Sequence, residues 1–214
     1  MVITQHTKFI DLLRRSLEQP LPGPEAQYRM AHVARRGHQQ VPDTARKAAV
    51  LALLYPRHDN WHIVLIERVT HQDDHHSGQI SLPGGRHEST DPDLATTALR
   101  EAEEEVGVNG HRIELIGGLT DLYIPVSNYL VHPYVGFTEF PPKFVPEERE
   151  VNAILEVPFS LFLKKDTVRT RHLTINPQIT LRDVPYYHVF DKMIWGATAM
   201  MLSELTEVVE RSQR

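Results

Sequence analysis

The chain has no cysteine among its 214 residues, which excludes disulfide bonds and thiolate metal sites and suits a reducing compartment. It also lacks a run of about 18 apolar residues, so the sequence predicts no membrane-spanning helix. Residues 9–19, "FIDLLRRSLEQ", mix charges with apolar residues, unlike a secretory signal. An excess of cations is missing as well: the net charge is −5, which argues against broad binding of nucleic acid or an anionic membrane, although local basic pockets stay compatible with it. We therefore expect a cytoplasmic protein with neither a nucleic-acid nor a membrane partner.

The composition that remains is that of an ordinary globular chain. Hydrophobic residues make up 41% and charged residues 24%, and the length suits one domain of generous size. Residues 9–19 have the spacing of a surface helix, followed by a Pro/Gly break at 19–25 and a polar connection at 35–47. We expect an N-terminal helical extension over residues 1–44 and the main domain over residues 45–214.

Short apolar runs rich in β-formers begin at residue 48 and are separated by turn residues. The predicted strands cover residues 48–55, 62–69, 113–124, 129–138, 153–163 with a break into a short helix at Pro158, and 186–190. Residues 192–212 have the length and spacing of a closing helix. Strands on both sides of a central helix indicate a mixed α/β or α+β domain with a partly mixed sheet.

The central helix is predicted between Asp91 and Gly107. Its apolar residues recur at intervals of three and four and form one buried stripe, composed of Ala95, Ala98, Leu99, Ala102 and Val106. Asp91 is expected to be the N-cap, with Pro92 at the first helical position. Gly107 is expected to end the helix.

Three glutamates, Glu101, Glu104 and Glu105, lie at the end of this helix, where the macrodipole is already negative. Glu101 is three and four residues from the other two, and like charges at that spacing cost about 0.2–0.5 kcal/mol per pair. Arg100 can reach Glu103 or Glu104, but one arginine does not neutralise the group. Two interpretations follow: a solvated acidic face whose penalties are absorbed by packing elsewhere, or a set of oxygen ligands for Mg²⁺ or Mn²⁺.

The surrounding residues resemble the Nudix box, G-x5-E-x7-R-E-U-x-E-E-x-G-U, in which U is a bulky apolar residue. The match runs from Gly85 through "REAEEEVGV" at 100–108. It departs from the pattern twice, because the interval from Gly85 to Arg100 is one residue longer and the upstream acid is Asp91. The resemblance implies a Nudix-type α/β/α sandwich with a mixed sheet and a carboxylate-bearing central helix. It also implies hydrolysis of a nucleoside diphosphate derivative with Mg²⁺ or Mn²⁺.

The resemblance gives roles to residues of the box. Glu101, Glu104 and Glu105 would hold the metal, and either Glu104 or Glu105 would orient or deprotonate the attacking water. Arg100 would orient a metal-site glutamate. The ordinary alternative for Arg100 is a surface ion pair with Glu103.

A second stretch, "HHSGQISLPGG" at 75–85, resembles the segment H-x-G-Q-x-x-F-P-G-G of the coenzyme A pyrophosphatase branch of this family. The matching residues are His76, Gly78, Gln79, Pro83, Gly84 and Gly85. Leu82 replaces the usual phenylalanine, Arg68 stands where the branch usually has an arginine, and Glu150 aligns with a further metal-site carboxylate. By this resemblance Arg68, His76, Gln79 and the two glycines bind the substrate. The ordinary alternatives are a common strand-end arginine, loop packing and a tight turn.

The branch also implies the substrate, which is coenzyme A or an acyl-CoA, cut to 4′-phosphopantetheine or its acyl form and adenosine 3′,5′-bisphosphate. Two rivals stay open: a Nudix hydrolase for another substrate such as ADP-ribose, and a non-catalytic nucleotide-binding module. Such modules usually lose glutamates of the box, and this chain keeps them. A homodimer follows the habit of the family, and the N-terminal helix would cover the active site, form a dimer interface or do neither.

Overall fold

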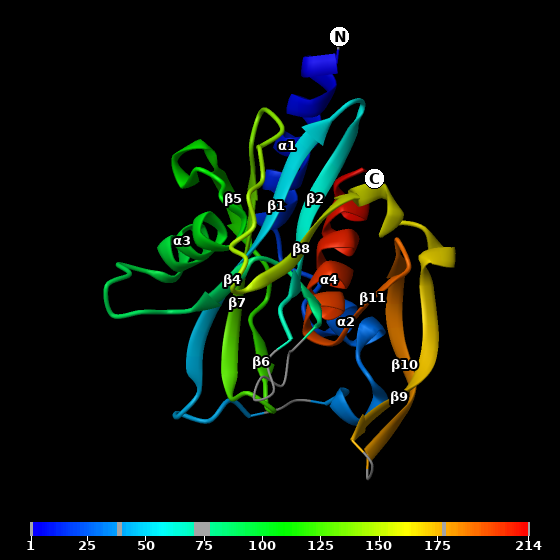
Figure 1. Ribbon diagram of the computed structural model, residues 1–214. Helices are drawn as coiled ribbons and strands as arrows, with labels where there is room; N and C mark the ends of the chain where they lie inside the picture. The colour runs from blue at the N-terminus through cyan, green and yellow to red at the C-terminus, as the bar shows by residue number, and fades with distance from the viewer. Residues whose placement is uncertain (1, 38–39, 71–77, 177–178, 214) are drawn as a thin grey trace.

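The computed structural model describes residues 2–37, 40–70, 78–176 and 179–213 (Figure 1). The helices are α1 (Val2–Leu17), α2 (Pro24–Gln27), α3 (Leu94–Val106) and α4 (Gly196–Ser212). The strands are β1 (Arg46–Arg57), β2 (Asn60–Arg68), β3 (Ile80–Ser81), β4 (Gly84–Arg86), β5 (Glu114–Gly118), β6 (Leu122–Ile124), β7 (Tyr129–Phe137), β8 (Val151–Pro158), β9 (Val168–Asn176), β10 (Ile179–Val189) and β11 (Lys192–Trp195). Short 3₁₀ turns cover Tyr28–Met30, Val33–Arg35, Gly110–Arg112, Phe159–Leu161 and Lys165–Thr167. None of the helices within these described ranges is long and apolar enough to cross a membrane.

Strand β1 lies at the centre of an eight-stranded sheet because it pairs along both of its edges. One edge runs parallel to β7, with Ala48 opposite Val131. The other edge is shared by β2 and β4, both antiparallel, and β4 places Gly84 opposite Val50. The main order is β3-β2-β1-β7-β5, while β6 pairs with β7 and β8 with β2. The sheet is therefore mixed, as the sequence predicted.

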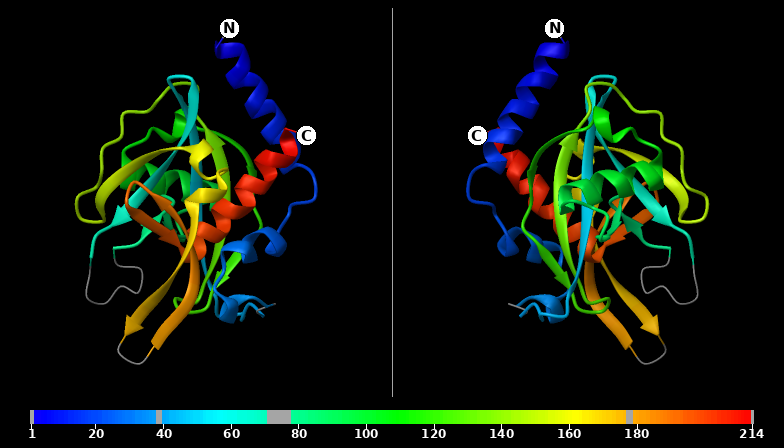
Figure 2. Two further views of the ribbon diagram at one scale, coloured as in Figure 1. Left: turned by 90° about the vertical axis from the view of Figure 1, so that its right-hand side faces the viewer. Right: turned by 90° about the vertical axis from the view of Figure 1, so that its left-hand side faces the viewer.

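The two faces of β1 bury different helices, because successive side chains of a strand point to opposite faces. Leu51 and Leu53 pack in a cluster with the apolar stripe of α3, which includes Ala98 and Ala102. The alternate residues of β1, among them Leu54, pack in a second cluster with α4. Figures 1 and 2 show α3 on one side of the sheet and α1 with α4 on the other. This three-layer α/β/α arrangement confirms the predicted fold class.

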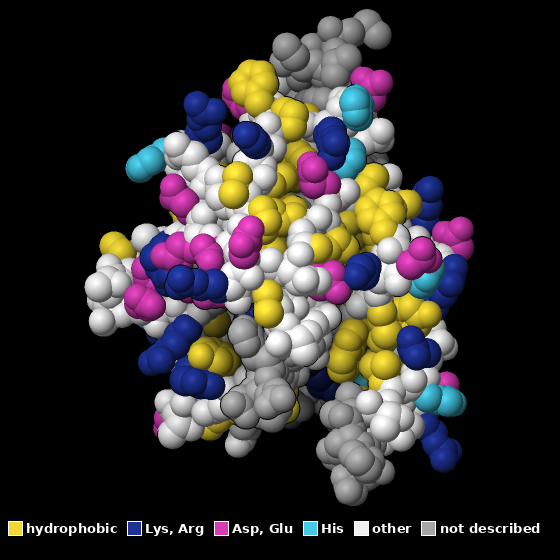
Figure 3. Space-filling view, in the orientation of Figure 1, with side chains coloured by type: hydrophobic (Ala, Val, Ile, Leu, Met, Phe, Trp, Pro, Cys, Tyr) yellow, Lys and Arg dark blue, Asp and Glu magenta, His cyan; other side chains and the backbone are white. Residues whose placement is uncertain are grey.

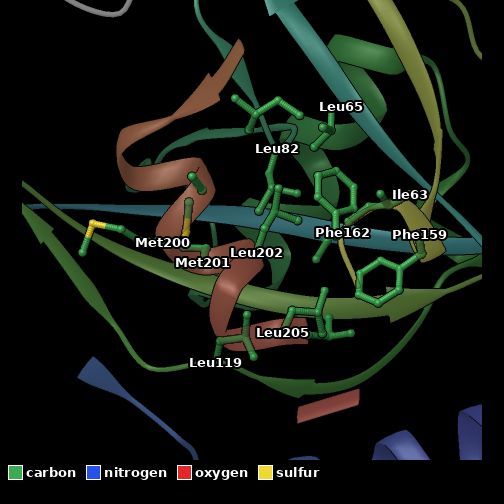
Figure 4. Close-up of a cluster of buried hydrophobic side chains, with 14 of the residues drawn as sticks. Ile63, Leu65, Leu82, Leu119, Phe159, Phe162, Met200, Met201, Leu202 and Leu205 are labelled. Carbon is green, nitrogen blue, oxygen red and sulfur yellow. The ribbon is translucent and has the colours of Figure 1, made fainter. Parts of the chain in front are cut away.

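The larger of the two clusters lies between the sheet and α4 (Figure 4). Leu202 and Leu205 of α4 pack there with Phe159 and Phe162, which follow β8. Among the side chains of helix α1 that the structure describes, Ile10, Leu13 and Leu17 are buried in this cluster. Residues predicted as a surface helix thus lie on the surface with one apolar face built into the core.

A three-stranded sheet of β9, β10 and β11 stands beside the main sheet and corrects two expectations. Residues 168–176, "VRTRHLTIN", were not predicted as a strand, because polar side chains dominate the segment. Pairing with β10 is what makes the segment extended. Residues 192–195 were predicted as helix, but Trp195 pairs with Tyr186 of β10 and the helix begins at Gly196, which has φ +64°. The run 113–124 also splits into β5 and β6.

Candidate active site

Helix α3 begins two residues later than predicted. Asp93 is its N-cap, since its side chain accepts a hydrogen bond from the Thr96 N–H at 2.7 Å. The prediction that Asp91 is the N-cap is wrong, because its buried carboxylate is directed to a stronger donor. It accepts from Arg100 Nε at 2.8 Å and Nη2 at 3.0 Å, and from Thr97 Oγ1 at 2.9 Å. The Arg100 guanidinium holds the pKa of Asp91 well below its usual range.

The other end of α3 closes at Gly107, as predicted. This glycine is left-handed with φ 70°, and its N–H donates to the Glu103 carbonyl. The last carbonyls of the helix are satisfied from elsewhere: the Val145 N–H donates to the Val106 carbonyl at 2.9 Å and the Glu147 N–H to the Glu105 carbonyl at 3.0 Å. Residues 145–150 are thereby held against the end of α3. Burial raises the pKa of Glu101 and of Glu105, and the charge of nearby Glu150 raises both further.

Glu105 is a buried carboxylate, with only 2% of the residue exposed. It accepts a hydrogen bond from the Gly84 N–H at 2.7 Å and lies 3.7 Å from Arg68 Nη1. Burial outweighs these two contacts and raises the pKa of Glu105 to about 8. A cation placed beside this carboxylate would favour its ionised form.

Arg100 connects the other box glutamates. Its Nη2 lies 3.0 Å from Glu101 and its Nη1 2.9 Å from Glu104, while Nε holds Asp91. Glu101 is largely covered and burial raises its pKa, whereas the Glu104 side chain is 58% exposed. The alternative of a surface pair with Glu103 is not the arrangement in the structure, because Arg100 pairs with Asp91, Glu101 and Glu104. Figure 3 shows the resulting mixture of acidic and basic side chains over α3.

Gly84 and Gly85 of β4 lie between these carboxylates and strand β1. A Cβ at Gly85 would lie 2.3 Å from Glu101 Oε2, so a larger residue would displace that carboxylate. Gly84 has φ +148°, and a Cβ there would meet the Ala49 carbonyl oxygen at 2.3 Å. The Gly-Gly pair is therefore required by close packing of β4 between β1 and α3.

The acidic residues of α3 supply the oxygen donors that a divalent cation takes. In the part of the chain that the structure describes, no group of three or more acidic or imidazole side chains is arranged so that it could hold a metal ion as it stands. Two observations nevertheless fit a cation: Glu101 and Glu105 are covered carboxylates one turn apart, and Glu150 adds negative charge to both. A bound cation would offset this repulsion and burial. The donor chemistry therefore fits, and the ligand assignments stay a prediction.

A cleft of about 1110 Å³ opens on the far side of the glycine pair. Gly84 and Gly85 line it, together with Arg68 and Gln79. Its described lining contains four arginines and no aspartate or glutamate; the arginines are Arg35, Arg46, Arg68 and Arg86. Such a lining suits an anionic ligand.

The predicted residues thus fall into two groups on the two sides of the Gly-Gly pair. Glu101, Glu104, Glu105, Arg100 and Glu150 lie on the α3 side, and Arg68 and Gln79 on the cleft side. His76 lies outside the described residues. The sequence did not single out three of the cleft arginines, Arg35, Arg46 and Arg86. Two of them, Arg35 and Arg46, lie within residues 35–47. The basic residues of that stretch were a signal, but the stretch was interpreted as a polar connection.

This chain is similar to known proteins in both sequence and fold. A family model described as the NUDIX domain matches residues 45–175. Nudix hydrolase 15, mitochondrial, of Arabidopsis thaliana is 32% identical over 169 residues, covering 76% of this chain and 58% of that relative. Nudix hydrolase 22, chloroplastic, of the same plant is 34% identical over 170 residues, covering 77% of this chain and 55% of that relative. This chain therefore spans a little over half the length of these plant relatives.

A bacterial relative matches over more of its own length. The Nudix hydrolase NudL of Enterobacter sp. (strain 638) is 34% identical over 165 residues, covering 75% of this chain and 81% of that protein. Among solved structures, the Nudix hydrolase RenU from M. smegmatis has a TM-score of 0.55 at 18% identity, covering 78% of this chain and 87% of that chain, which is a likeness of fold. The family model matches more than half of the sequence and the bacterial relative is covered over most of its length. The chain belongs to the Nudix hydrolase family.

Proposed function

We propose that this chain is a Mg²⁺- or Mn²⁺-dependent pyrophosphohydrolase that splits the diphosphate of coenzyme A or acyl-CoA. The products are 4′-phosphopantetheine, or its acyl form, and adenosine 3′,5′-bisphosphate. The observation that carries the proposal is the cleft, whose described lining has four arginines and no acid and includes Gly84 and Gly85, which contact two covered glutamates. Arginines suit the oxygens of a diphosphate because they donate several hydrogen bonds in a fixed geometry.

The coenzyme A branch is supported by the motif residues and by the rest of the lining. Arg68, Gln79, Gly84 and Gly85, all taken from that resemblance, line the same cleft. The lining is otherwise rich in apolar side chains, including Met30, Leu181, Val184, Trp195, Met200 and Met201. A pantetheine arm or an acyl chain suits such a surface better than the second ribose of ADP-ribose does. His76 keeps its predicted role as a further substrate contact.

Nudix hydrolases generally use divalent metal ions. In this proposal Glu101, Glu104, Glu105 and Glu150 hold the cation. The bound ion supplies positive charge where negative charge develops on the phosphoryl oxygens. Mg²⁺ and Mn²⁺ are the ions whose preferred ligands match this set of carboxylates.

The side chains around the cation have separate tasks. Arg100 positions Glu101 and Glu104, because it contacts both and is itself anchored on buried Asp91. The Gly84 N–H positions the Glu105 carboxylate. Either Glu104 or Glu105 accepts the proton of the attacking water. Arg68 lies between Glu105 and the cleft, where it can hold a phosphoryl oxygen.

A product assay with matched variants tests this function. Purified protein with Mg²⁺ or Mn²⁺ is given coenzyme A, dephospho-CoA, ADP-ribose and diadenosine polyphosphates at equal concentration, and products are separated by chromatography. Glu105→Gln should lower kcat by at least about a hundredfold, because it removes a predicted ligand and proton acceptor. Glu103→Gln is the matched control, since Glu103 is exposed on the same helix and outside the proposed ligand set.

The outcomes separate the parts of the proposal. Release of adenosine 3′,5′-bisphosphate, with coenzyme A ahead, supports both the chemistry and the branch. Preference for ADP-ribose would keep the metal helix and reject the branch. No hydrolysis of any of these substrates would favour a nucleotide-binding module. The cytoplasmic location, the homodimer and the division at residues 44 and 45 belong to the same proposal and stay predictions.

A further inference from the structure

The cleft has a second group of arginines remote from the carboxylates of α3. One wall is formed by residues 30–35, here called the N-terminal wall, and the adjoining wall by the β6–β7 hairpin from Ile124 to Tyr129. Arg35 belongs to the first, and Arg46 at the start of β1 lies beside the second. The family model begins at residue 45, so the N-terminal wall lies outside the family match.

Arg35 is a half-buried cation without a carboxylate partner in the described chain. Its Nη2 donates to the Tyr123 carbonyl at 3.0 Å, which fixes the guanidinium against the hairpin. Burial lowers its pKa below the ordinary value, so the folded protein bears a cost for keeping this charge. An anionic ligand would compensate for that cost.

Arg46 is held at the same hairpin by different contacts. Its Nη2 donates to the Ser127 carbonyl at 2.8 Å, and its guanidinium lies 4.1 Å from the centre of the Tyr129 ring. Within the described ranges it too has no ion pair with an acid. These contacts restrict the side chain before any ligand arrives, which lowers the entropy lost on binding.

The segment that leads directly into the N-terminal wall is fastened to α4 by polar contacts. Glu204, which is fully buried, accepts from the Gly23 N–H at 3.0 Å and from Gln27 Nε2 at 2.9 Å. Arg29 adds an ion pair with Glu207 at 2.8 Å. The wall that carries Arg35 therefore has a fixed position relative to the cleft.

Both arginines are held at the end of β1 that lies away from the Gly-Gly pair: Arg46 begins that strand, and Tyr123, which anchors Arg35, pairs with Leu130, the partner of Lys47. Gly84 and Gly85 pair with Val50 and Ala49, which lie four and three positions along β1 from Arg46, or about 13 and about 10 Å at the rise of a β-strand. A diphosphate extends over only a few bonds, whereas a nucleotide with a phosphate on its ribose reaches much further. We propose that Arg35 and Arg46 form a second anion subsite, which binds a phosphate group of the substrate away from the diphosphate that is cut.

This inference rests on the proposed function and deepens it, because it assigns recognition of the ribose 3′-phosphate to two residues. Coenzyme A and dephospho-CoA differ only in that phosphate. We expect Arg35→Gln and Arg46→Gln each to lower the ratio of kcat/KM for coenzyme A to that for dephospho-CoA by about tenfold or more, the size of one lost charged hydrogen bond. Arg112→Gln, at an exposed position of the same charge outside the cleft, should leave the ratio unchanged.

Ligand binding gives a second measurement that needs no turnover. Titration calorimetry with adenosine 3′,5′-bisphosphate and with AMP should show tighter binding of the bisphosphate to the unmodified protein, and Arg35→Gln should remove most of the difference. Arg35→Lys, which keeps the charge, should retain part of it. Thermal unfolding of each variant checks that it is folded.

Two results would overturn the subsite: equal loss of both substrates in the arginine variants, or equal binding of the two nucleotides by the unmodified protein. Failure of the proposed function looks different. If neither substrate is cut, a preference for adenosine 3′,5′-bisphosphate that depends on Arg35 would still support the subsite and reject only the hydrolysis.

Discussion

At the scale of single residues, the main finding is the path of contacts from Asp91 through Arg100 to the box glutamates. Asp91 is covered and fully hydrogen bonded, and Arg100 reaches Glu101 and Glu104 from it. An acid that departs from the family pattern in type thus anchors the arginine that positions two proposed ligands. Asp91 acts through another residue and contacts neither metal nor substrate in the proposal.

Replacing Asp91 with asparagine should reduce the free energy of unfolding at pH 7 by about 2 kcal/mol, because a buried charged hydrogen-bond partner of Arg100 is lost. The pKa of Asp91 is lowered in the folded state, so its contribution is complete above the ordinary value of 3.8 and is lost as pH falls toward the folded pKa. The difference between the two proteins should therefore shrink at about pH 3. Urea unfolding at both pH values measures it.

Asp93→Asn is the charge-matched control for this experiment. Asparagine is as good an N-cap as aspartate, so the free energy of unfolding should change much less than in Asp91→Asn. A larger loss from Asp93→Asn than from Asp91→Asn would contradict the roles that the structure gives to these two residues.

At the scale of elements, α4 organises parts of the chain that are distant in sequence. Its apolar face packs on the sheet, and Glu204 joins α2 to the loop after β5 through Gly23, Gln27 and Thr120. A carboxylate suits this place because it offers four acceptor sites and each of these three neighbours donates to it.

Glu204→Gln should therefore lower the free energy of unfolding by about 2–4 kcal/mol, since one acceptor oxygen becomes a donor that faces other donors. Glu210→Gln, at an exposed position on the same helix, is the matched control and should change stability by less than about 0.5 kcal/mol. Chemical denaturation measures both. Equal small effects in the two variants would show that the buried carboxylate is not a structural clamp.

At the scale of the whole molecule, the net charge is −5, but acidic and basic side chains lie on different sides of the Gly84–Gly85 pair. Acidic groups gather on the α3 side, while the described lining of the cleft carries arginines alone among charged residues. The net charge of the chain therefore predicts the local charge on neither side of the Gly-Gly pair, because local potentials depend on which side chains the fold places together.

This separation predicts that a divalent cation stabilises the folded protein. At about one hundred times its Kd, Mn²⁺ or Mg²⁺ should add about 2.7 kcal/mol, which raises Tm by about 5 to 10 °C for a chain of this size. Differential scanning calorimetry measures the shift, and EDTA should reverse it. The double variant Glu101→Gln/Glu105→Gln should lose the shift, although without metal it should be at least as stable, because burial disfavours both charges.

Glu103→Gln should keep the full metal-dependent shift. The same shift in the double variant, or no shift with either cation in the unmodified protein, would reject Glu101 and Glu105 as ligands. Activity plays no part in this measurement, so it remains informative if the proposed substrate is wrong.

Much of this architecture could be predicted from sequence because it depends on local patterns. The stripe of α3, the stop at Gly107 and the alternating residues of β1 follow from the periods of helix and strand. The box glutamates could be recognised because their spacing is fixed within one helix. Strand β9 and the start of α4 could not, because pairing with β10 decides the conformation of residues 168–176 and 192–195.

The sequence by itself determined the family, the fold class and the acidic helix, since each depends on residues that are close together along the chain. Only the tertiary structure decided that Asp91 binds Arg100 instead of capping α3 and that Val145 and Glu147 bind the last carbonyls of α3. It alone decided that Arg35, far from the box, lines the same cleft as Arg68. The physical reason is common to all three: side chains and backbone groups contact the neighbours that the packed chain places beside them, and those neighbours need not be close in sequence.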